Sequence, residues 1–194
     1  MSELYFASHN LDKVKEIQSI VGDRYTVKSL HDLNLTEEIP ETGNTLEDNA
    51  VIKAQYLYDR FQVACFADDS GLEVSALNGA PGVYSARFAG PQKDSMGNMT
   101  LLLEQLSEQH DRTAQFRTVI CFIESDGSVH TFEGAIRGSI TETKVGGEGF
   151  GYDPIFMPDG YDLTFGQMTS SVKNKISHRA LAMQKLQQYL GSKK

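Results

Sequence analysis

The order of apolar and polar positions in the first third of the chain predicts alternating strands and helices. Residues 4–7 form a short apolar run typical of a strand, and residues 26–30 form a second. Between them, apolar residues recur at helical spacing: Val14, Ile17, Ile20 and Val21. A second helix is predicted to begin after Thr45, because Thr45 is followed three residues later by Asp48, as in a capping box. This helix would run to about Phe61.

The middle of the chain supplies the strands expected at the centre of a sheet. Residues 63–67 form an apolar run ending at Asp68-Asp69-Ser70-Gly71, which places two carboxylates and a hydroxyl at the expected exit of a central strand. Residues 116–124 and 129–136, joined through Asp126-Gly127, predict a β-hairpin. We therefore expect an α/β fold with a mixed central β-sheet flanked by helices.

The last third combines helices with a glycine-rich loop. Residues 101–106 contain the leucines of a further helix, and residues 146–154 form the loop. A closing amphipathic helix is predicted over residues 177–190, with Ser177 as its N-cap. The spacing of the three glycines at the start of the loop differs from the dinucleotide-binding fingerprint Gly-x-Gly-x-x-Gly.

Composition indicates one soluble domain spanning residues 1–194. The chain is 40% hydrophobic and 23% charged, and at this length a protein buries about 70% of its unfolded surface. Because no apolar run approaches the roughly 20 residues that span a bilayer, and the N-terminus lacks a signal pattern, we expect a cytoplasmic protein without a membrane partner. Cys65 and Cys121 each lie in an apolar run, which predicts buried thiols.

The formal net charge of −8 argues against a nucleic-acid partner, because affinity for the phosphate backbone comes mainly from Lys and Arg. A small polyanion would need a local group of cations or a metal held by carboxylates. The five histidines show no zinc-binding spacing.

The segment between the first strand and the first helix is a candidate phosphate-binding loop. It reads Ser8, His9, Asn10, Leu11, Asp12 and Lys13. Amides at a helix N-terminus, together with hydroxyl, amide and ammonium side chains, suit a phosphate group. The same pattern also fits an ordinary helix N-cap followed by a solvated lysine.

Three carboxylates are candidate metal ligands. Glu41 lies in an acidic loop, and Asp68 and Asp69 follow the apolar strand run, so the three could converge on one cation. Mg²⁺ takes one or two carboxylates and fills its remaining positions with water and substrate phosphate oxygens. Solvated acids in two unrelated loops are the alternative, and Glu37 and Glu38 fit that alternative well.

Two further segments offer groups for a nucleobase. The glycine loop carries Phe150, Tyr152 and Asp153, and its aromatic rings offer stacking surfaces for a base. Lys173 and the sequence 176–179 gather cationic groups at the expected start of the last helix, where the helix dipole favours negative charge instead. A flexible loop and a solvated basic face are the alternatives.

Together these segments resemble the ordered motifs of the inosine/xanthosine triphosphate pyrophosphatases, the Ham1-like family. In chain order the motifs are Ser8-x-Asn10-x-x-Lys13, Glu41-Thr42-Gly43, Asn49-Ala50-x-x-Lys53-Ala54, Ala67-Asp68-Asp69-Ser70-Gly71-Leu72, Gly79-Ala80-Pro81-Gly82-Val83-Tyr84-Ser85-Ala86-Arg87, Phe150-Gly151-Tyr152-Asp153-Pro154 and Ile176-Ser177-His178-Arg179. The series covers nearly the whole chain.

The resemblance implies a role for each group of residues. Residues 8–13 would grip the triphosphate, with Lys13 and Lys53 acting in catalysis. Glu41 and Asp69 would bind Mg²⁺, Asp69 would also be the general base, and Ser70 would contact substrate. Seven residues would enclose and recognise the base: Phe150, Gly151, Tyr152, Asp153, Lys173, His178 and Arg179.

The resemblance also implies two lobes with a nucleotide cleft between them, and a homodimer. Two positions depart from the family pattern. His9 stands where relatives often have glycine, and Ser171-Val172 precede Lys173 where relatives commonly carry two acids.

The activity expected from the resemblance is hydrolysis of ITP, dITP and XTP to the monophosphate and pyrophosphate, which removes damaged nucleotides. Lys173 and Arg179 can only donate hydrogen bonds, so they would pair a keto oxygen and reject the 6-amino group of adenine. Two alternatives stay open. One is a pyrophosphatase for a different modified nucleotide, as in the Maf-like proteins, and the other is a nucleotide sensor without catalysis.

Overall fold

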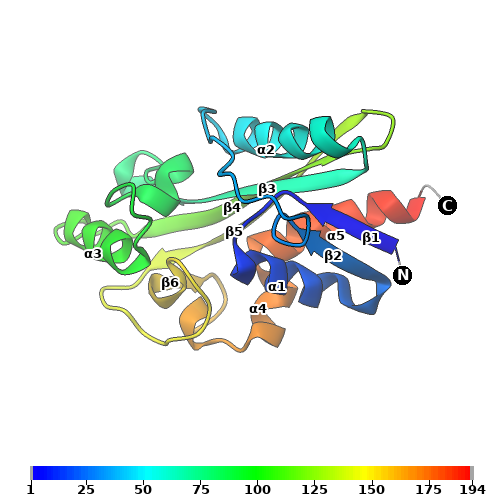
Figure 1. Cartoon of the computed structure of the whole chain (residues 1–194). Helices are drawn as coiled ribbons and strands as arrows, with labels where there is room; N and C mark the ends of the chain where they lie inside the picture. The colour runs from blue at the N-terminus through cyan, green and yellow to red at the C-terminus, as the bar shows by residue number, and fades with distance from the viewer. Residues whose placement is uncertain (1, 193–194) are drawn as a thin grey trace. The chain divides into compact units, whose positions relative to one another are not determined.

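The computed structural model describes residues 2–192; strands and α-helices alternate up to residue 123, after which two more strands and then two helices follow (Figure 1). The strands are β1 (Ser2–Phe6), β2 (Tyr25–Ser29), β3 (Cys65–Val74), β4 (Thr113–Ile123), β5 (Val129–Ile140) and β6 (Phe156–Pro158). The α-helices are α1 (Leu11–Val21), α2 (Leu46–Phe61), α3 (Ser95–Gln105), α4 (Ser170–Ile176) and α5 (His178–Ser192). Within this range, no helix is long and apolar enough to cross a membrane.

The strands form one mixed sheet in the order β2-β1-β3-β4-β5-β6. β1 pairs in parallel with β2 and with β3, whereas β5 pairs antiparallel with β6. The predicted turn through Asp126 and Gly127 is confirmed, because the Glu124 amide donates to the Ser128 carbonyl at 2.9 Å and closes the connection between β4 and β5. The expected α/β class and mixed sheet are therefore confirmed.

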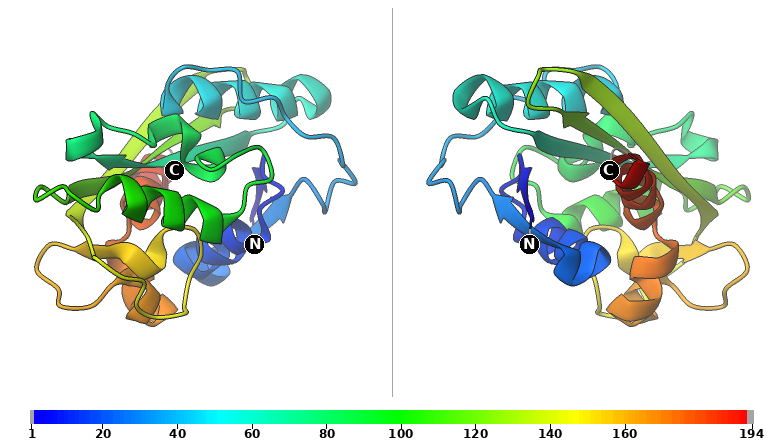
Figure 2. Two further views of the ribbon diagram at one scale, coloured as in Figure 1. Left: turned by 90° about the vertical axis from the view of Figure 1, so that its left-hand side faces the viewer. Right: turned by 90° about the vertical axis from the view of Figure 1, so that its right-hand side faces the viewer.

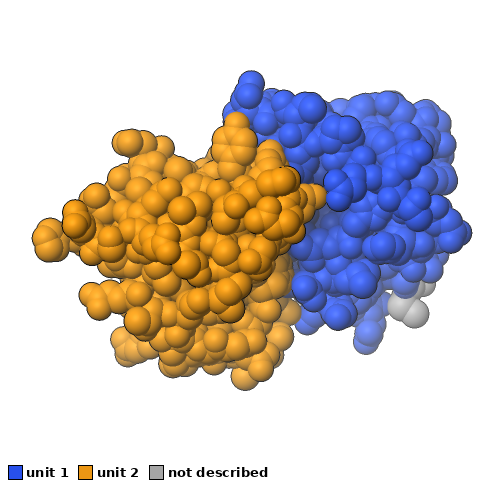
Figure 3. Space-filling model, turned by 60° about the vertical axis from the view of Figure 1, so that its left-hand side comes forward, with its two compact units in different colours: residues 1–69, 118–134, 179–194 blue, residues 70–117, 135–178 orange. Residues whose placement is uncertain are grey.

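The chain divides into two units, coloured separately in Figure 3. Unit 1 contains residues 1–69, 118–134 and 179–194, and unit 2 contains residues 70–117 and 135–178. Strands β3, β4 and β5 contribute residues to both units. The single-domain description of residues 1–194 stays a prediction.

Unit 1 has helices on both faces of its strands (Figure 2). Ile17 of α1 and Met183 of α5 pack with Phe6 and Phe66 of the strands in one buried cluster. The rings of Phe6 and Phe66 stack with centroids 4.6 Å apart. On the opposite face, α2 lies against β3, where the Cys65 thiol contacts a carbonyl of the helix at 3.5 Å.

Helices α1 and α2 of unit 1 both begin with a side-chain N-cap. The Asn10 side chain accepts hydrogen bonds from two amides of the first turn of α1. The Thr45 side chain and Asp48 form a reciprocal capping box at the start of α2, which confirms that prediction. α2 ends at Phe61, and Gln62 adopts a left-handed conformation with φ 52°.

Unit 2 has its own apolar core. Phe116, Phe156 and Phe165 contact one another, with the rings of Phe116 and Phe156 in an edge arrangement 4.7 Å apart. Leu102 and Leu106, from the predicted leucine helix, are buried in the same cluster. Each unit therefore has a hydrophobic cluster that can hold its own polar residues in place.

Two sequence-based boundaries are wrong. β3 does not end at residue 67 but continues to Val74, so Asp68 and Asp69 lie inside a strand. The apolar pattern stops earlier than the strand because the buried groups beyond it are paired charges. Lys173 lies in the additional helix α4, not at the start of the last helix, and Ser177 connects α4 to α5, its amide donating to the Lys173 carbonyl.

Both cysteines are free and buried, as predicted. Burial raises the pKa of the Cys65 thiol to about 12, so this group is a protonated packing side chain at neutral pH.

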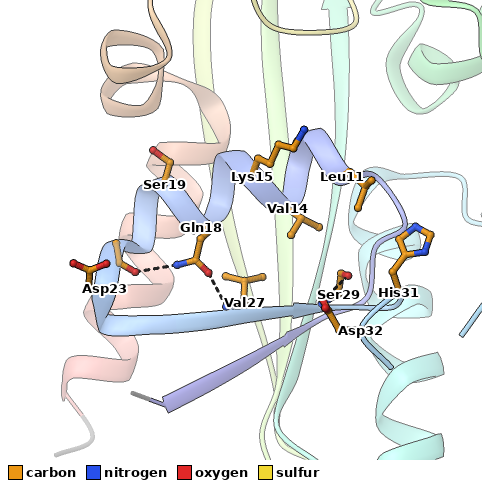
Figure 4. Close-up of a pocket in the computed structure, with 11 residues that line it drawn as sticks. Leu11, Val14, Lys15, Gln18, Ser19, Asp23, Val27, Ser29, His31 and Asp32 are labelled. Atoms are coloured by element: carbon orange, nitrogen blue, oxygen red, sulfur yellow. Dashed lines mark hydrogen bonds between the residues drawn. The ribbon is translucent and has the colours of Figure 1, made fainter. Parts of the chain in front are cut away.

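The sheet edge at β2 is covered by side chains (Figure 4). The Gln18 side chain accepts a hydrogen bond from the Val27 amide at 2.9 Å and donates to the Tyr25 carbonyl at 3.0 Å. Asp32 accepts from the Ser29 amide at 2.7 Å. These contacts satisfy backbone groups of the edge strand that would otherwise be open to pairing with another chain.

Candidate active site

The predicted phosphate-binding loop connects β1 to α1 in unit 1. Asn10 Oδ1 accepts from the amides of Asp12 at 3.0 Å and Lys13 at 3.1 Å, and Ser8 Oγ accepts from the Asn10 amide at 3.2 Å. The loop is thus a helix N-cap, as the alternative interpretation held. The lysine that follows is not solvated, however, because the side chain of Lys13 is only 16% exposed.

His9, which departs from the family pattern, ties this loop to the acidic loop. Its Nε2 lies 2.8 Å from the Glu37 carbonyl oxygen, and since a carbonyl can only accept, Nε2 carries the proton. The Glu37 side chain is 73% exposed, as expected for a solvated acid, yet its carboxylate also accepts from the Tyr56 hydroxyl of α2 at 2.9 Å. The acidic loop is therefore held both to the loop of residues 8–13 and to α2.

Asp68 is the centre of a buried chain of charges. The Lys13 ammonium lies 3.0 Å and 2.9 Å from its two carboxylate oxygens, and Arg179 Nε donates to Oδ2 at 3.1 Å. The same guanidinium binds Glu16 of α1 through Nη1. The chain Lys13–Asp68–Arg179–Glu16 therefore joins α1, β3 and α5, and the side chains of Asp68 and Arg179 are each 1% exposed.

The charges of this chain hold one another ionised. Burial alone raises the pKa of Asp68, but Lys13 and Arg179 outweigh burial and hold that pKa well below its usual range. For Arg179, Glu16 and Asp68 overcome the effect of burial and raise its pKa. Lys13 differs, since burial lowers its pKa more than Asp68 raises it.

A second group of charges forms around Lys53 on α2. Its ammonium donates to Asp69 Oδ1 at 2.7 Å and to Glu41 Oε1 at 3.0 Å. Asn49, one helical turn earlier, donates to Asp69 Oδ2 at 3.2 Å and accepts from the Gly43 amide at 2.8 Å. The structure thus brings Glu41 of the acidic loop and Asp69 of β3 together at the Lys53 ammonium.

The two neighbouring aspartates have different partners. Successive side chains of a strand point to opposite faces. Asp68 therefore binds Lys13 and Arg179, whereas Asp69 binds Lys53. Among residues 2–192, no three Asp, Glu, His or Cys side chains gather closely enough to hold a metal. The structure therefore does not bring the three carboxylates together, whereas Asp69 and Glu41 both contact the Lys53 ammonium.

The protonation behaviour of the second group follows from burial and pairing. Burial raises the pKa of Asp69, and Lys53 opposes that rise without cancelling it. The pKa of Lys53 itself is raised, because Asp69 and Glu41 together outweigh the effect of burial. Asp69 is therefore a better proton acceptor than an ordinary aspartate, beside a lysine that stays charged.

Unit 2 contains the residues predicted to surround a base. Lys173 Nζ lies 2.6 Å from Asp153 Oδ2, with side chains 7% and 3% exposed. Asp153 also accepts from the Phe150 amide at 2.8 Å. Lys173 Nζ lies 4.7 Å from the Phe150 ring centroid and 5.6 Å from that of Phe165. This lysine thus combines a buried carboxylate partner with two aromatic neighbours.

Two other predicted base-site residues are buried in unit 2. His178 stacks on Phe116 with ring centroids 4.6 Å apart, and the Tyr152 hydroxyl donates to the Ser85 carbonyl at 2.8 Å. Burial raises the pKa of Tyr152 well above its usual range. Gly149 has φ +75°, and a Cβ at this position would lie 2.0 Å from an Asp153 carboxylate oxygen, so the loop needs glycine there.

The predicted site residues fall into two sets. Unit 1 holds Ser8, His9, Asn10, Leu11, Asp12, Lys13, Glu41, Lys53, Asp69 and Arg179, and unit 2 holds Ser70, Phe150, Gly151, Tyr152, Asp153, Lys173 and His178. Sequence reasoning missed Glu16, although its position three residues after Lys13 places both on one face of α1. It noted that Asn49 shares a face with Lys53 but gave Asn49 no role.

Comparison with known proteins identifies the family of the chain. The model of the Ham1 family matches residues 4–189. A dITP/XTP pyrophosphatase of Flavobacterium johnsoniae is 50% identical over 184 residues, which cover 95% of each chain. One from Bacillus subtilis is 46% identical over 193 residues, covering 98% of each chain.

Solved structures show the same fold. The Staphylococcus aureus Ham1 protein superposes with a TM-score of 0.89 and 40% identity, covering all of both chains. A nucleoside-triphosphatase, dITP/XTP pyrophosphatase, from Mycobacterium abscessus gives a TM-score of 0.76 with 41% identity, covering 95% of this chain and 98% of that chain.

Proposed function

Because the chain belongs to the Ham1 family, we propose that it hydrolyses dITP, ITP and XTP to the monophosphate and pyrophosphate. Relatives named dITP/XTP pyrophosphatase, 50% and 46% identical to this chain, support the activity. The main supporting observation is that Lys53 contacts both Asp69 and Glu41, which come from distant segments. Asp68, which precedes Asp69 in the chain, pairs with Lys13.

The balance of charge in unit 1 supports a divalent cation as cofactor. Three cations (Lys13, Lys53 and Arg179) contact four carboxylates (Glu16, Glu41, Asp68 and Asp69). Fully ionised, the group carries one net negative charge, which repels a triphosphate. A divalent cation reverses that sign.

We assign Mg²⁺ to Glu41 and Asp69. Their oxygens meet at one ammonium, and two carboxylates with open positions for phosphate oxygens are the donor set that Mg²⁺ prefers. When bound, the ion supplies charge neutralisation on the phosphate oxygens.

The catalytic roles follow from the charges and pKa values of the chain's own groups. Lys13 and the loop 8–13 bind the triphosphate, and Lys53 lies beside the reacting phosphate. Asp69 accepts a proton from a water whose oxygen attacks a phosphorus of the α–β bridge; the bond from that phosphorus to the bridging oxygen breaks, which yields the monophosphate and pyrophosphate. Positioning and electrostatics supply most of the rate enhancement, since phosphoryl transfer leaves little covalent work to the protein.

The base site is assigned to unit 2. Phe150, Gly151, Tyr152 and Asp153 enclose the base, and Lys173 donates to a keto oxygen. His178 lines the recognition edge in the same proposal, and Ser70 contacts the substrate. The role of Arg179 in base recognition, the nucleotide cleft and the homodimer also stay proposals.

One assay tests the proposed function. Purified protein is incubated with dITP, ITP, XTP, dATP, dGTP or UTP, with and without Mg²⁺, and pyrophosphate and orthophosphate are measured separately. We expect Mg²⁺-dependent pyrophosphate from the first three nucleotides. Orthophosphate alone would indicate a phosphatase, preference for a pyrimidine would favour the Maf-like alternative, and tight binding without product would indicate a sensor.

A further inference from the structure

Glu16 is a buried acid that the proposed mechanism does not use. It lies on α1, three residues after Lys13, and is 8% exposed. Its carboxylate contacts Arg179 of α5, whose guanidinium also binds Asp68 of β3. An unpaired carboxylate is costly to bury, so the position of Glu16 depends on this guanidinium.

The contacts connect Glu16 to the phosphate-binding lysine through two intermediates. Asp68 binds Lys13 with both carboxylate oxygens, at 3.0 Å and 2.9 Å, while Oδ2 also accepts from Arg179 at 3.1 Å. The two cations thus share one carboxylate. Because Arg179 pairs with Glu16 as well as with Asp68, it interacts less strongly with Asp68. Both oxygens of Asp68 are therefore available to Lys13.

We infer that Glu16 is a positioning residue for Lys13, acting through Arg179 and Asp68. The inference rests on the proposed function, in which Lys13 binds the triphosphate. Removing the Glu16 charge shifts Arg179 further onto Asp68, so that Lys13 is held less firmly and faces more positive charge. The consequences are weaker triphosphate binding and a Lys13 ammonium that is easier to deprotonate.

The charged groups that face Lys13 determine in which direction its pKa changes when the Glu16 charge is removed. They are Asp68 and Asp69 on β3, Lys53 on α2 and Arg179 on α5. Burial already lowers the pKa of Lys13, and Arg179 lowers it further against the opposing effect of Asp68. Without Glu16, less of the Arg179 charge is compensated. The pKa of Lys13 therefore falls, and affinity for the triphosphate is lost at a lower pH than in the wild type.

The test compares Glu16→Gln, which keeps the shape and removes the charge, with Glu104→Gln at an exposed position of α3. We expect Glu16→Gln to raise the KM for dITP about tenfold near neutral pH with kcat changed less, and to move the alkaline rise of KM to lower pH. A general loss of structure would instead lower the active fraction and leave the pH profile in place. Glu104→Gln should match the wild type.

A double-mutant cycle isolates the path of the effect. If Glu16 acts through Lys13, Glu16→Gln adds little to the KM increase of Lys13→Met. Full additivity of the two increases would overturn the inference.

A direct titration separates this inference from the proposed function. The ¹³Cε resonance of Lys13, assigned by its loss in Lys13→Met, is followed against pH in metal-free protein without nucleotide. A lower Lys13 pKa in Glu16→Gln supports the network even if the wild type cleaves no nucleotide, which would refute only the activity. An unchanged titration in folded Glu16→Gln overturns the network. If that variant does not fold, Glu16→Asp takes its place, and it must shift the pKa in the same direction by a smaller amount.

Discussion

The two units both bury lysines, but they neutralise them in different ways. In unit 1, Lys53 has two carboxylate partners from distant segments, and Lys13 shares its carboxylate with Arg179. In unit 2, Lys173 pairs with Asp153, and aromatic rings pack around it. In unit 1 the lysines belong to a network of several ion pairs. In unit 2 a single ion pair lies beside aromatic rings.

This difference matches what each part of the proposed substrate requires. A triphosphate carries several negative charges that change during hydrolysis, so its site needs several cations that are already held in place. A nucleobase is neutral and is recognised by the position of single donors and acceptors, so a lysine fixed by a buried carboxylate suits it. If this contrast is right, substitutions in unit 1 affect turnover and stability strongly, and those in unit 2 affect selectivity.

The largest expected effect is that of Asp69→Asn on turnover. The amide cannot accept the proton of the attacking water, so kcat should fall by about a thousandfold. The protein should stay folded because Lys53 keeps its contact with Glu41. Pyrophosphate release and circular dichroism measure the two properties. A wild-type rate would remove Asp69 from the mechanism.

The next largest effect is expected on the free energy of unfolding, which should fall more for a substitution in unit 1 than for one in unit 2. Asp68→Asn leaves Lys13 and Arg179 buried with one carboxylate fewer and should cost about 3 to 5 kcal/mol of unfolding free energy. Asp153→Asn removes the carboxylate beside a single cation and should cost less. Urea denaturation of both variants measures the difference. Equal losses would mean that the network and the Lys173–Asp153 pair are equivalent.

The same comparison has a dependence on pH. The pKa of Asp68 is lower in the folded protein than the value of about 3.9 in an unfolded chain. Its carboxylate therefore contributes stability that is fully present above a pH of about 4 and is lost as the pH falls further, because the unfolded chain then binds a proton that the folded protein does not. The gap in unfolding free energy between the wild type and Asp68→Asn should accordingly narrow as the pH is lowered from about 5 to about 2. Urea denaturation across this range measures the gap, and a constant gap would contradict the pairing of an ionised Asp68 with Lys13 and Arg179.

Sequence reasoning predicted the elements of this fold well where the pattern is apolar. The helix from Thr45 to Phe61 and the turn at Asp126-Gly127 were correct because capping and turn chemistry are local. The end of β3 was placed too early, because buried paired charges look like solvent-exposed residues in a sequence. A hydrophobicity pattern cannot distinguish the two.

For the site, the motifs identified the chemical groups but not their partners. Asp68 and Asp69 looked alike in sequence, and only the alternation of side chains along β3 separates them. Glu16 and Arg179 lie 163 residues apart, so their contact follows from the packing of α1 and α5 and from no local pattern.

A smaller effect is expected for Lys173 in unit 2. Lys173→Met removes the donor proposed for the keto oxygen and leaves Asp153 buried with the Phe150 amide as a remaining partner. Discrimination between dITP and dATP, measured as the ratio of their kcat/KM values, should fall roughly 10- to 100-fold. Lys173→Arg keeps the charge and serves as the control. Unchanged discrimination would place base recognition elsewhere.

The smallest effect is expected for Lys15, on the same helix as Lys13 and Glu16 but on another face. Its ammonium lies 4.0 Å from Asp12, both side chains are more than 60% exposed, and it lines the open pocket beside β2 (Figure 4). Solvent screens such a pair, so Lys15→Met should change the unfolding free energy by less than about 0.5 kcal/mol and leave KM within about twofold. Lys13→Met, measured alongside by urea denaturation and dITP kinetics, should weaken substrate binding strongly. Similar effects of the two substitutions would show that total charge near the loop matters, and not the buried network that Lys13 joins.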